Sequence, residues 1–124
     1  MKLLIVDDMK IIRDGLSEAM SAVQEVTRIE CAADVQSAIA LLDEMAPDIV
    51  LLDMHLGDGD GVSVLQAIRD KGQSTRVVVL TRFPGYSSTC KEFEVDYFFD
   101  KTEDPEKVVL AVTHLARAGK IQRA

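Results

Sequence analysis

Three short runs of large aliphatic residues constrain the fold more than any other feature of the sequence. Residues 3–6 read Leu-Leu-Ile-Val, residues 49–52 read Ile-Val-Leu-Leu, and residues 77–80 read Val-Val-Val-Leu. A strand without alternating polar residues is buried on both faces, as in a parallel sheet that has helices on either side. Each run therefore predicts an internal strand of such a sheet.

Segments in which apolar residues recur at helical spacing separate these strands. We predict helices over residues 9–23, 34–46, 61–70, 86–93 and 105–118, and weaker strands over 26–31 and 97–99. Asp34 is the expected N-cap of the second helix, and Gly119 is expected to end the last one. Five repeats of strand followed by helix predict the α/β class, with a doubly wound parallel sheet. Residues 1–124 are expected to form one domain, with residues 119–124 frayed.

Composition limits the partners and the compartment that fit the chain. The net charge is −7 and the pI about 4.7, whereas general electrostatic attraction to nucleic acid requires basic patches. The aliphatic run at residues 3–6 is too short for a signal peptide or a membrane span. Cys31 and Cys90 form no Cys-x-x-Cys pair. We therefore expect a cytoplasmic protein with reduced thiols, no direct nucleic-acid contact and no membrane insertion.

Polar residues follow the predicted strands at one edge of the sheet. Asp7 and Asp8 follow the first strand, Asp53 follows the third, Thr81 ends the fourth, and Lys101 follows the fifth. The carboxyl ends of parallel strands meet at one edge, and ligands bind there in open α/β sheets. Each residue alone has an ordinary explanation as a helix cap, a turn residue or a solvated charge. Their joint placement at four strand ends favours a shared site.

The residue types at this edge indicate phosphoryl chemistry on a metal ion. Three neighbouring carboxylates repel one another unless a cation is present, and a set of oxygen ligands suits Mg²⁺, with Mn²⁺ as the other candidate. A hydroxyl group and an ammonium group beside the metal can hold phosphoryl oxygens. Asp53, in the middle of the group, is the expected nucleophile, and aspartyl phosphate is the expected covalent product.

These residues resemble the motifs of a known family over essentially the whole chain. The matching features are Asp7-Asp8 after Leu-Leu-Ile-Val, Asp53 after Ile-Val-Leu-Leu, Gly61, Thr81 after Val-Val-Val-Leu, and Phe98-Phe99-Asp100-Lys101. In this combination the chain is similar to the receiver domains of two-component response regulators, of the stand-alone chemotaxis or phosphorelay type. The resemblance implies a flavodoxin-like five-stranded parallel sheet, with strand order 2-1-3-4-5 and five helices.

The resemblance also implies a role for each matching position. Asp53 would be the phosphoacceptor, and the metal ligands would be Asp7, Asp8, Asp53 and the backbone carbonyl of His55. Thr81 and Lys101 would bind the phosphoryl group, and Phe98 would be the switch aromatic.

The partners that the resemblance implies are all proteins. A sensor histidine kinase or a phosphotransfer protein would donate the phosphoryl group from a phosphohistidine. A downstream protein would bind the surface of the fourth helix, the fifth strand and the fifth helix, and the chain would act as a monomer or as a phosphorylation-dependent dimer. Phosphorylation favours only the conformation that makes the new contacts, so the mechanism would be a population shift.

Two positions depart from the family pattern. Arg82 stands where the family mostly has a small residue, and it could shield the phosphoryl group from water. Arg82, His55 and Phe83 are predicted to tune phosphoryl lifetime; solvated side chains that point away from the site are the alternative. Thr102 follows Lys101, where the family usually has a proline in a cis bond. A cis bond before threonine costs about 2.5–4 kcal/mol, so a trans bond is expected.

Three functional interpretations follow from the sequence. The first is a receiver without an output domain on the same chain, which catalyses only its own phosphorylation and dephosphorylation and signals through another protein. The second is a small phosphohydrolase with an aspartate nucleophile, although His55 stands where such enzymes usually have an acidic residue. The third is a receiver-like interaction module that is not phosphorylated, and the intact set of site residues argues against it.

Overall fold

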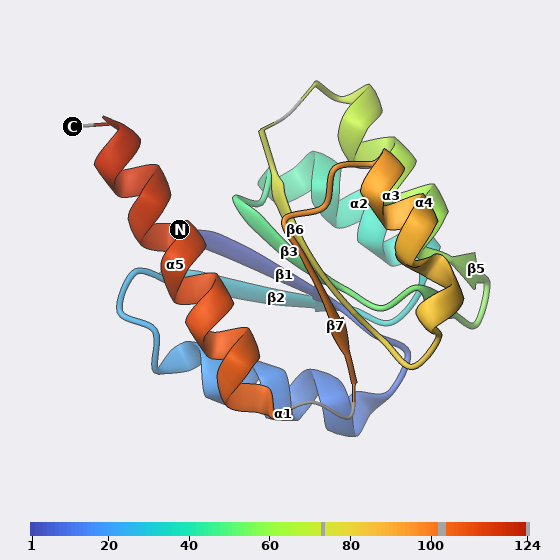
Figure 1. The fold of residues 1–124 in the computed structure, drawn as a ribbon, viewed down its shortest axis with the longest axis horizontal. Coiled ribbons are helices and arrows are strands. Elements are labelled where there is room, and N and C mark those ends of the chain that lie inside the picture. The colour runs from blue at the N-terminus through green and yellow to red at the C-terminus, as the bar shows by residue number, and fades with distance from the viewer. Residues whose placement is uncertain (73, 102–103, 124) are drawn as a thin grey trace.

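A five-stranded parallel sheet organises the fold, as the sequence predicts (Figure 1). The structure, a computed structural model, describes residues 1–72, 74–101 and 104–123, and the side chains of 119–123 are not described. The strands are β1 (Lys2–Val6), β2 (Arg28–Ala32), β3 (Ile49–Leu52), β6 (Arg76–Thr81) and β7 (Tyr97–Asp100). Their order in the sheet is β2-β1-β3-β6-β7. This is the predicted order 2-1-3-4-5, because β4 (His55–Leu56) and β5 (Gly59–Asp60) form a separate hairpin.

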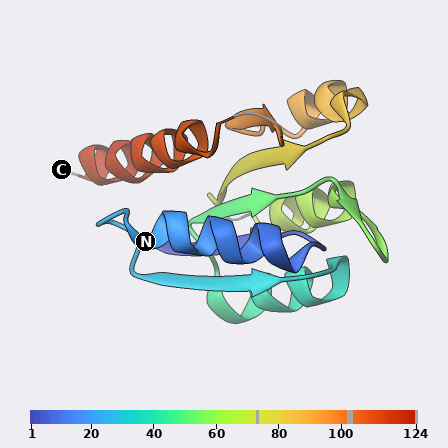
Figure 2. The ribbon, with the colours of Figure 1, turned by 90° about the horizontal axis from the view of Figure 1, so that it is seen from below.

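Helices cover both faces of the sheet. On one side lie α1 (Lys10–Ser21) and α5 (Pro105–Arg123), and on the other lie α2 (Val35–Met45), α3 (Gly61–Asp70) and α4 (Ser87–Glu92). A 3₁₀ turn, η1 (Pro84–Tyr86), leads into α4. Figure 2 shows the arrows of β2, β3 and β6 pointing the same way, so their carboxyl ends share one edge.

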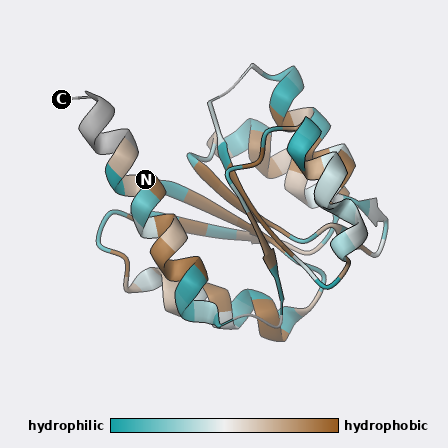
Figure 3. Ribbon diagram, viewed as in Figure 1, coloured by the Kyte–Doolittle hydropathy of each residue, from teal (hydrophilic) through white to brown (hydrophobic). Residues whose placement is uncertain are grey.

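The two faces of each central strand supply two hydrophobic cores. In β1, Leu4 and Val6 pack in the core under α2, α3 and α4, whereas Leu3 and Ile5 pack in the core under α1 and α5. Adjacent residues of a strand point to opposite faces, and both faces are covered here. The aliphatic runs are therefore apolar throughout, as the hydrophobic colouring of the central strands illustrates (Figure 3).

Several helix ends confirm or correct the sequence-based expectations. Asp34 is the N-cap of α2, and its carboxylate accepts the Ser37 amide in a capping box. The N-cap of α1 is Met9, which has no side-chain cap bond, so the ordinary explanation of Asp8 as a helix cap is wrong. The predicted end of the last helix at Gly119 is also wrong, because α5 continues to Arg123. A glycine inside a helix costs only about 1 kcal/mol relative to alanine, which is too little to force a stop.

The Lys101–Thr102 peptide bond involves Thr102, which lies outside the described residues. Among the helices of the described ranges, none has the length and apolar character needed to cross a membrane.

Candidate functional site

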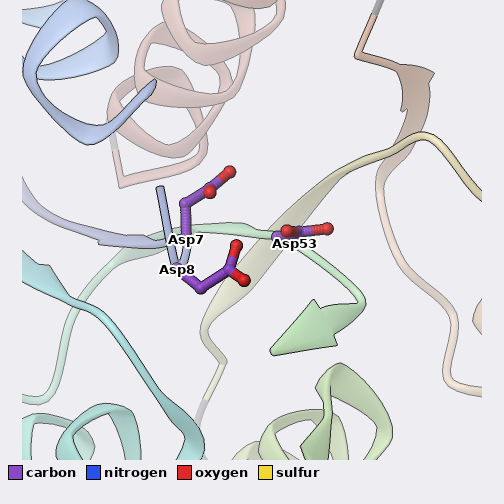
Figure 4. A group of neighbouring side chains, drawn as sticks. All are labelled: Asp7, Asp8 and Asp53. Atoms are coloured by element: carbon purple, nitrogen blue, oxygen red, sulfur yellow. The ribbon is translucent and has the colours of Figure 1, made fainter. Parts of the chain in front are cut away.

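Three carboxylates meet at the carboxyl edge of the sheet (Figure 4). Asp7 and Asp8 follow β1, and Asp53 follows β3, where its amide donates a 2.9 Å hydrogen bond to the Val6 carbonyl. That bond continues the β1–β3 ladder by one residue, so Asp53 has a fixed backbone position beside Asp7. Each of the three acidic residues offers an oxygen, and these oxygens lie within 4.8 Å of one another. Asp7 and Asp53 are buried, and Asp8 is exposed.

Lys101, which follows the edge strand β7, places its ammonium group against these carboxylates. Its amide donates to the Thr81 carbonyl at 3.1 Å, which extends the β6–β7 pairing past Asp100. Its Nζ then lies 2.7 Å from Asp7 Oδ2 and 2.9 Å from Asp53 Oδ2. The side chain is 9% exposed, so this contact is largely removed from water. Residues from three strands are thereby joined through one ammonium group.

Burial and charge shift the titration of the two central groups. Burial raises the pKa of Asp53, and the Asp7 charge adds to the rise, while the Lys101 ammonium and the His55 amide oppose it. The pKa of Lys101 is also raised: burial lowers it, but the contacts with Asp7 and Asp53 outweigh burial. Lys101 therefore stays protonated at neutral pH, and its ammonium contacts two of the three clustered carboxylates, those of Asp7 and Asp53.

The donor set fits a hard divalent cation. Among the described residues the cluster offers only carboxylate oxygens, which Mg²⁺ prefers over nitrogen or sulfur ligands. Burial of Asp53 and the nearby charge of Asp7 raise the pKa of this carboxyl group, and a bound cation would oppose both effects. Asp7, Asp8 and Asp53 are the residues that would hold the ion. The His55 carbonyl remains a predicted metal ligand. In the structure, the His55 amide donates a 3.3 Å hydrogen bond to Asp53 Oδ1.

Thr81 and Phe98 occupy positions beside the cluster. Thr81 is 1% exposed, and its hydroxyl oxygen accepts the Phe83 amide at 3.2 Å. This bond fixes the turn that leaves β6. Phe98 lies in β7, partly buried against the core under α2, α3 and α4. The Thr81 hydroxyl, which the sequence predicts to bind the phosphoryl group, thus has a local hydrogen-bond partner in this conformation. The Phe98 ring lies on the α4 side of the sheet.

The three residues predicted to tune lifetime lie in the segments that follow β3 and β6. The rings of His55 and Phe83 are 5.1 Å apart at an interplanar angle of 49°, and they connect the loop after β3 with the loop after β6. Arg82 is exposed, and its guanidinium lies 3.8 Å from Met9 Sδ, at the start of α1. The arginine therefore joins the loop after β6 to the start of α1. Sequence reasoning missed Met9, because its partner lies 73 residues away.

The loop after β3 is held by two aspartates of the β4–β5 hairpin. Asp60 is the N-cap of α3 and accepts the Val62 amide at 3.1 Å. The Asp58 carboxylate instead accepts hydrogen bonds from the amides of Val35 and Gln36, at the start of α2, at 2.8 and 3.2 Å. The sequence indicated only a Gly- and Asp-rich turn here, and no local signal pointed to a partner at the start of α2.

Comparison with known proteins agrees with this geometry. The family model described as "Response regulator receiver domain" matches residues 3–113. The nitrate/nitrite response regulator protein NarL of Escherichia coli K12 is 27% identical over 121 residues, covering 96% of this chain and 56% of that protein. The response regulator protein VraR of Staphylococcus aureus is 28% identical over 122 residues, covering 97% and 58%. The chain thus spans a little over half the length of these relatives.

Solved structures agree on the fold. The signal receiver domain of the putative response regulator NarL from Mycobacterium tuberculosis superposes with a TM-score of 0.79 at 25% identity, covering 94% of this chain and 95% of that one. A LuxR-family DNA-binding response regulator from Staphylococcus aureus gives 0.85 at 24% identity, covering 93% and 98%. The flavodoxin-like sheet order is therefore shared with receiver structures.

Proposed function

The chain belongs to the response regulator receiver domain family, and from that premise we propose that residues 1–124 form a single receiver that switches on phosphorylation of Asp53. The observation that carries the proposal is the buried group of Asp7, Asp53 and Lys101 at the carboxyl edge, with Asp8 beside it. A buried acidic cluster with a single ammonium suits transfer of a phosphoryl group, whose oxygens can replace the carboxylates as partners of the lysine.

Phosphoryl transfer would proceed from a phosphohistidine of a sensor kinase or a phosphotransfer protein. An Asp53 carboxylate oxygen attacks phosphorus, a P–O bond forms, the P–N bond breaks, and the imidazole leaves after taking up a proton. Mg²⁺, when bound, supplies positive charge that balances the acidic cluster and the phosphoryl oxygens. The Lys101 ammonium, already 2.9 Å from Asp53 Oδ2, is placed to donate hydrogen bonds to the incoming phosphoryl oxygens.

Switching would follow from a change of hydrogen-bond partners. The Thr81 hydroxyl now accepts the Phe83 amide, and it would turn to donate to a phosphoryl oxygen. That movement releases the loop after β6, and Phe98 can take the space beside Thr81. Phosphorylation favours only the arrangement that makes these contacts, so the two loop states change population.

The output would pass to a separate protein through the surface of α4, β7 and α5. On that surface the Tyr97 and Phe99 rings stack 5.7 Å apart, and Leu110 is 68% exposed beside them. One solved neighbour is called a DNA-binding response regulator, but the net charge of −7 argues against nucleic-acid contact by these 124 residues themselves. We propose a cytoplasmic receiver that acts as a monomer or dimerises on phosphorylation.

Arg82, with His55 and Phe83, would slow hydrolysis of the aspartyl phosphate by limiting access of water. We expect Arg82→Ala to shorten the lifetime several-fold, because the guanidinium contacts Met9, one residue after Asp8, and its loss would open this approach to water. Decay of the phosphorylated protein, followed by intact mass, measures this. Arg28→Ala, an exposed arginine at the opposite edge of the sheet, is the matched control. An unchanged decay rate in Arg82→Ala would remove Arg82 from the mechanism.

The test of the proposed function is intact mass after incubation with acetyl phosphate and Mg²⁺. Wild type should gain one phosphoryl group that hydroxylamine removes, and Asp53→Asn should gain none. If neither the small donor nor a phosphohistidine donor modifies the wild type, the chain is an unphosphorylated interaction module. Sustained turnover of a phosphoester would instead favour the phosphohydrolase.

A further inference from the structure

The β4–β5 hairpin ties the loop that follows Asp53 to the N-terminus of α2. Both oxygens of the Asp58 carboxylate are used: Oδ1 accepts the Val35 amide at 2.8 Å, and Oδ2 accepts the Gln36 amide at 3.2 Å. Asp34 accepts the next amide, that of Ser37, at 2.8 Å. The first amides of a helix have no partner within the helix, and its N-terminus carries partial positive charge. Two carboxylates from different parts of the chain thus cap one helix.

The two capping carboxylates, those of Asp34 and Asp58, differ in the parts of the chain that they join to α2. Asp34 belongs to the segment that enters α2, so its bonds lie within one turn of chain. Asp58 lies five residues after the proposed phosphoacceptor, and its partner amides are 22 and 23 residues away. Of these two caps, only Asp58 therefore also restrains the loop after β3. The other end of the hairpin is restrained by Asp60, which caps α3.

The restrained loop includes the backbone beside the reacting carboxylate. His55 pairs with Asp60 in the hairpin, and its amide donates to Asp53 Oδ1. Its carbonyl is the proposed backbone ligand of the metal. Leu56 anchors one side of the hairpin in the core under α2, α3 and α4, whereas Gly57 at the turn lies in open space. The hydrogen bonds of Asp58 join this turn to the start of α2.

From these contacts we infer that Asp58 is a positioning residue, which holds the loop of His55 in the geometry that binds the metal and the phosphoryl group, and which couples that site to the start of α2. This inference rests on the proposed function. Coupling between two sites is reciprocal, so occupancy of the acidic site must in turn strengthen the Asp58 bonds to Val35 and Gln36.

The first test compares Mg²⁺ affinity, by calorimetry, in wild type, Asp58→Ala, Asp58→Asn and Asp34→Ala. Loss of a residue that orients a ligand directly typically costs roughly 10–100-fold in metal affinity. Asp58 acts through the loop, so we expect a loss of about three- to tenfold in Asp58→Ala. Asp34 has the same charge and caps the same helix but has no bond to the loop after β3, so Asp34→Ala should change the Mg²⁺ affinity less than about twofold. Asp58→Asn keeps an acceptor oxygen and should fall between wild type and Asp58→Ala.

The controls separate positioning from charge and from folding. A charge effect alone would make Asp58→Asn equal to Asp58→Ala and would fade at high salt, and either result would overturn the inference. Equal losses in Asp58→Ala and Asp34→Ala would also overturn it, because helix capping alone would then explain both. Thermal melts of all variants, read by circular dichroism, verify that each is folded at the temperature of the titration.

The second test measures whether occupancy of the acidic site changes the hydrogen bonds at the start of α2. Addition of Mg²⁺ and beryllofluoride, a mimic of the phosphoryl group, should slow hydrogen exchange of the Val35 and Gln36 amides in wild type but not in Asp58→Ala. Unchanged exchange in wild type that binds Mg²⁺ and is phosphorylated would sink the inference and leave the proposed function intact. If the wild type neither binds Mg²⁺ nor becomes phosphorylated, both the inference about Asp58 and the proposed function are wrong.

Discussion

At the scale of single residues, the position of Lys101 sets the electrostatics of the site. Its ammonium touches Asp7 and Asp53 at 2.7 and 2.9 Å in a place where water contributes little screening. We expect the same lysine to raise affinity for an incoming phosphoryl group and to compete with a metal ion for the carboxylates. Its charge thus favours one ligand and opposes the other, and these two effects can be measured separately.

Removal of this ammonium should strengthen binding of Mg²⁺. Unit charges 4 Å apart interact by about 1–4 kcal/mol at effective dielectric constants between those of water and a protein surface, so we expect Lys101→Met to raise Mg²⁺ affinity about tenfold. Isothermal titration calorimetry measures the change. Lys10→Met is the control, because Lys10 pairs with Asp14 on the exposed face of α1. Equal or weaker binding by Lys101→Met would contradict this account.

At the scale of elements, helix N-termini set the geometry around Asp53. α3 begins at Gly61, whose amide donates to the Met54 carbonyl at 2.9 Å. A Cβ at this position would lie 2.9 Å from the Asp53 carbonyl oxygen and 2.7 Å from Met54 Sδ. Only a glycine allows the helix to start this close to the strand that carries the proposed phosphoacceptor.

Gly61→Ala should therefore destabilise the fold and displace Asp53. Overpacking of this kind typically costs about 1–3 kcal/mol, and we expect a loss of that size with slower phosphorylation by acetyl phosphate. Denaturant unfolding and the rate of mass gain measure the two effects. Gly57→Ala is the matched control: a Cβ there has no atom within 4 Å, so its free energy of unfolding should stay close to wild type. Similar losses in both variants would contradict the steric explanation.

The N-cap of α2 should make stability depend on pH in the acidic range. Hydrogen bonds from the Ser37 side chain and amide lower the pKa of Asp34, with burial opposing them weakly. Its folded pKa lies below its unfolded pKa, so the cap stabilises the protein above the unfolded pKa and is lost as pH falls through the folded one. The stability difference between wild type and Asp34→Ala should be full at pH 7 and shrink on acidification. Urea unfolding across pH measures it, and a constant difference would contradict the capping role.

At the scale of the whole molecule, two hydrophobic cores hold the edge of the sheet in place. β1 and β3 contribute to both cores, and their ends carry Asp7 and Asp53. The stability of the domain and the geometry of the acidic site are consequently linked. A ligand that binds only the folded site stabilises the whole domain by mass action.

Mg²⁺ should raise the melting temperature of the whole domain. At a concentration of 100 times Kd the expected stabilisation is about 2.7 kcal/mol. For a chain of this length that corresponds to a rise of roughly 10 °C. Asp7→Asn and Asp53→Asn should each show a much smaller rise, since each removes a carboxylate of the cluster. Calorimetric melts in Mg²⁺ and in EDTA at matched ionic strength measure this, and equal rises in all three proteins would place the metal elsewhere.

Much of the molecule follows from the sequence alone. Strands buried on both faces leave unbroken aliphatic runs, and parallel strands place their carboxyl ends at one edge, so Asp7, Asp53, Thr81 and Lys101 were predictable neighbours. Asp34 was predictable as a cap, because its partner is three residues away. These features depend on local pattern and on the regular geometry of a sheet.

Other features were decided only by the tertiary structure. The bonds from Asp58 to α2, the contact of Arg82 with Met9 and the His55–Phe83 ring pair join loops whose conformations no local rule fixes. The continuation of α5 past Gly119 is likewise invisible to residue propensity. The sequence by itself determined the sheet and the composition of the acidic edge, because burial and strand direction leave a periodic record. Packing decided how the loops close around that edge, because their partners lie far apart in the chain.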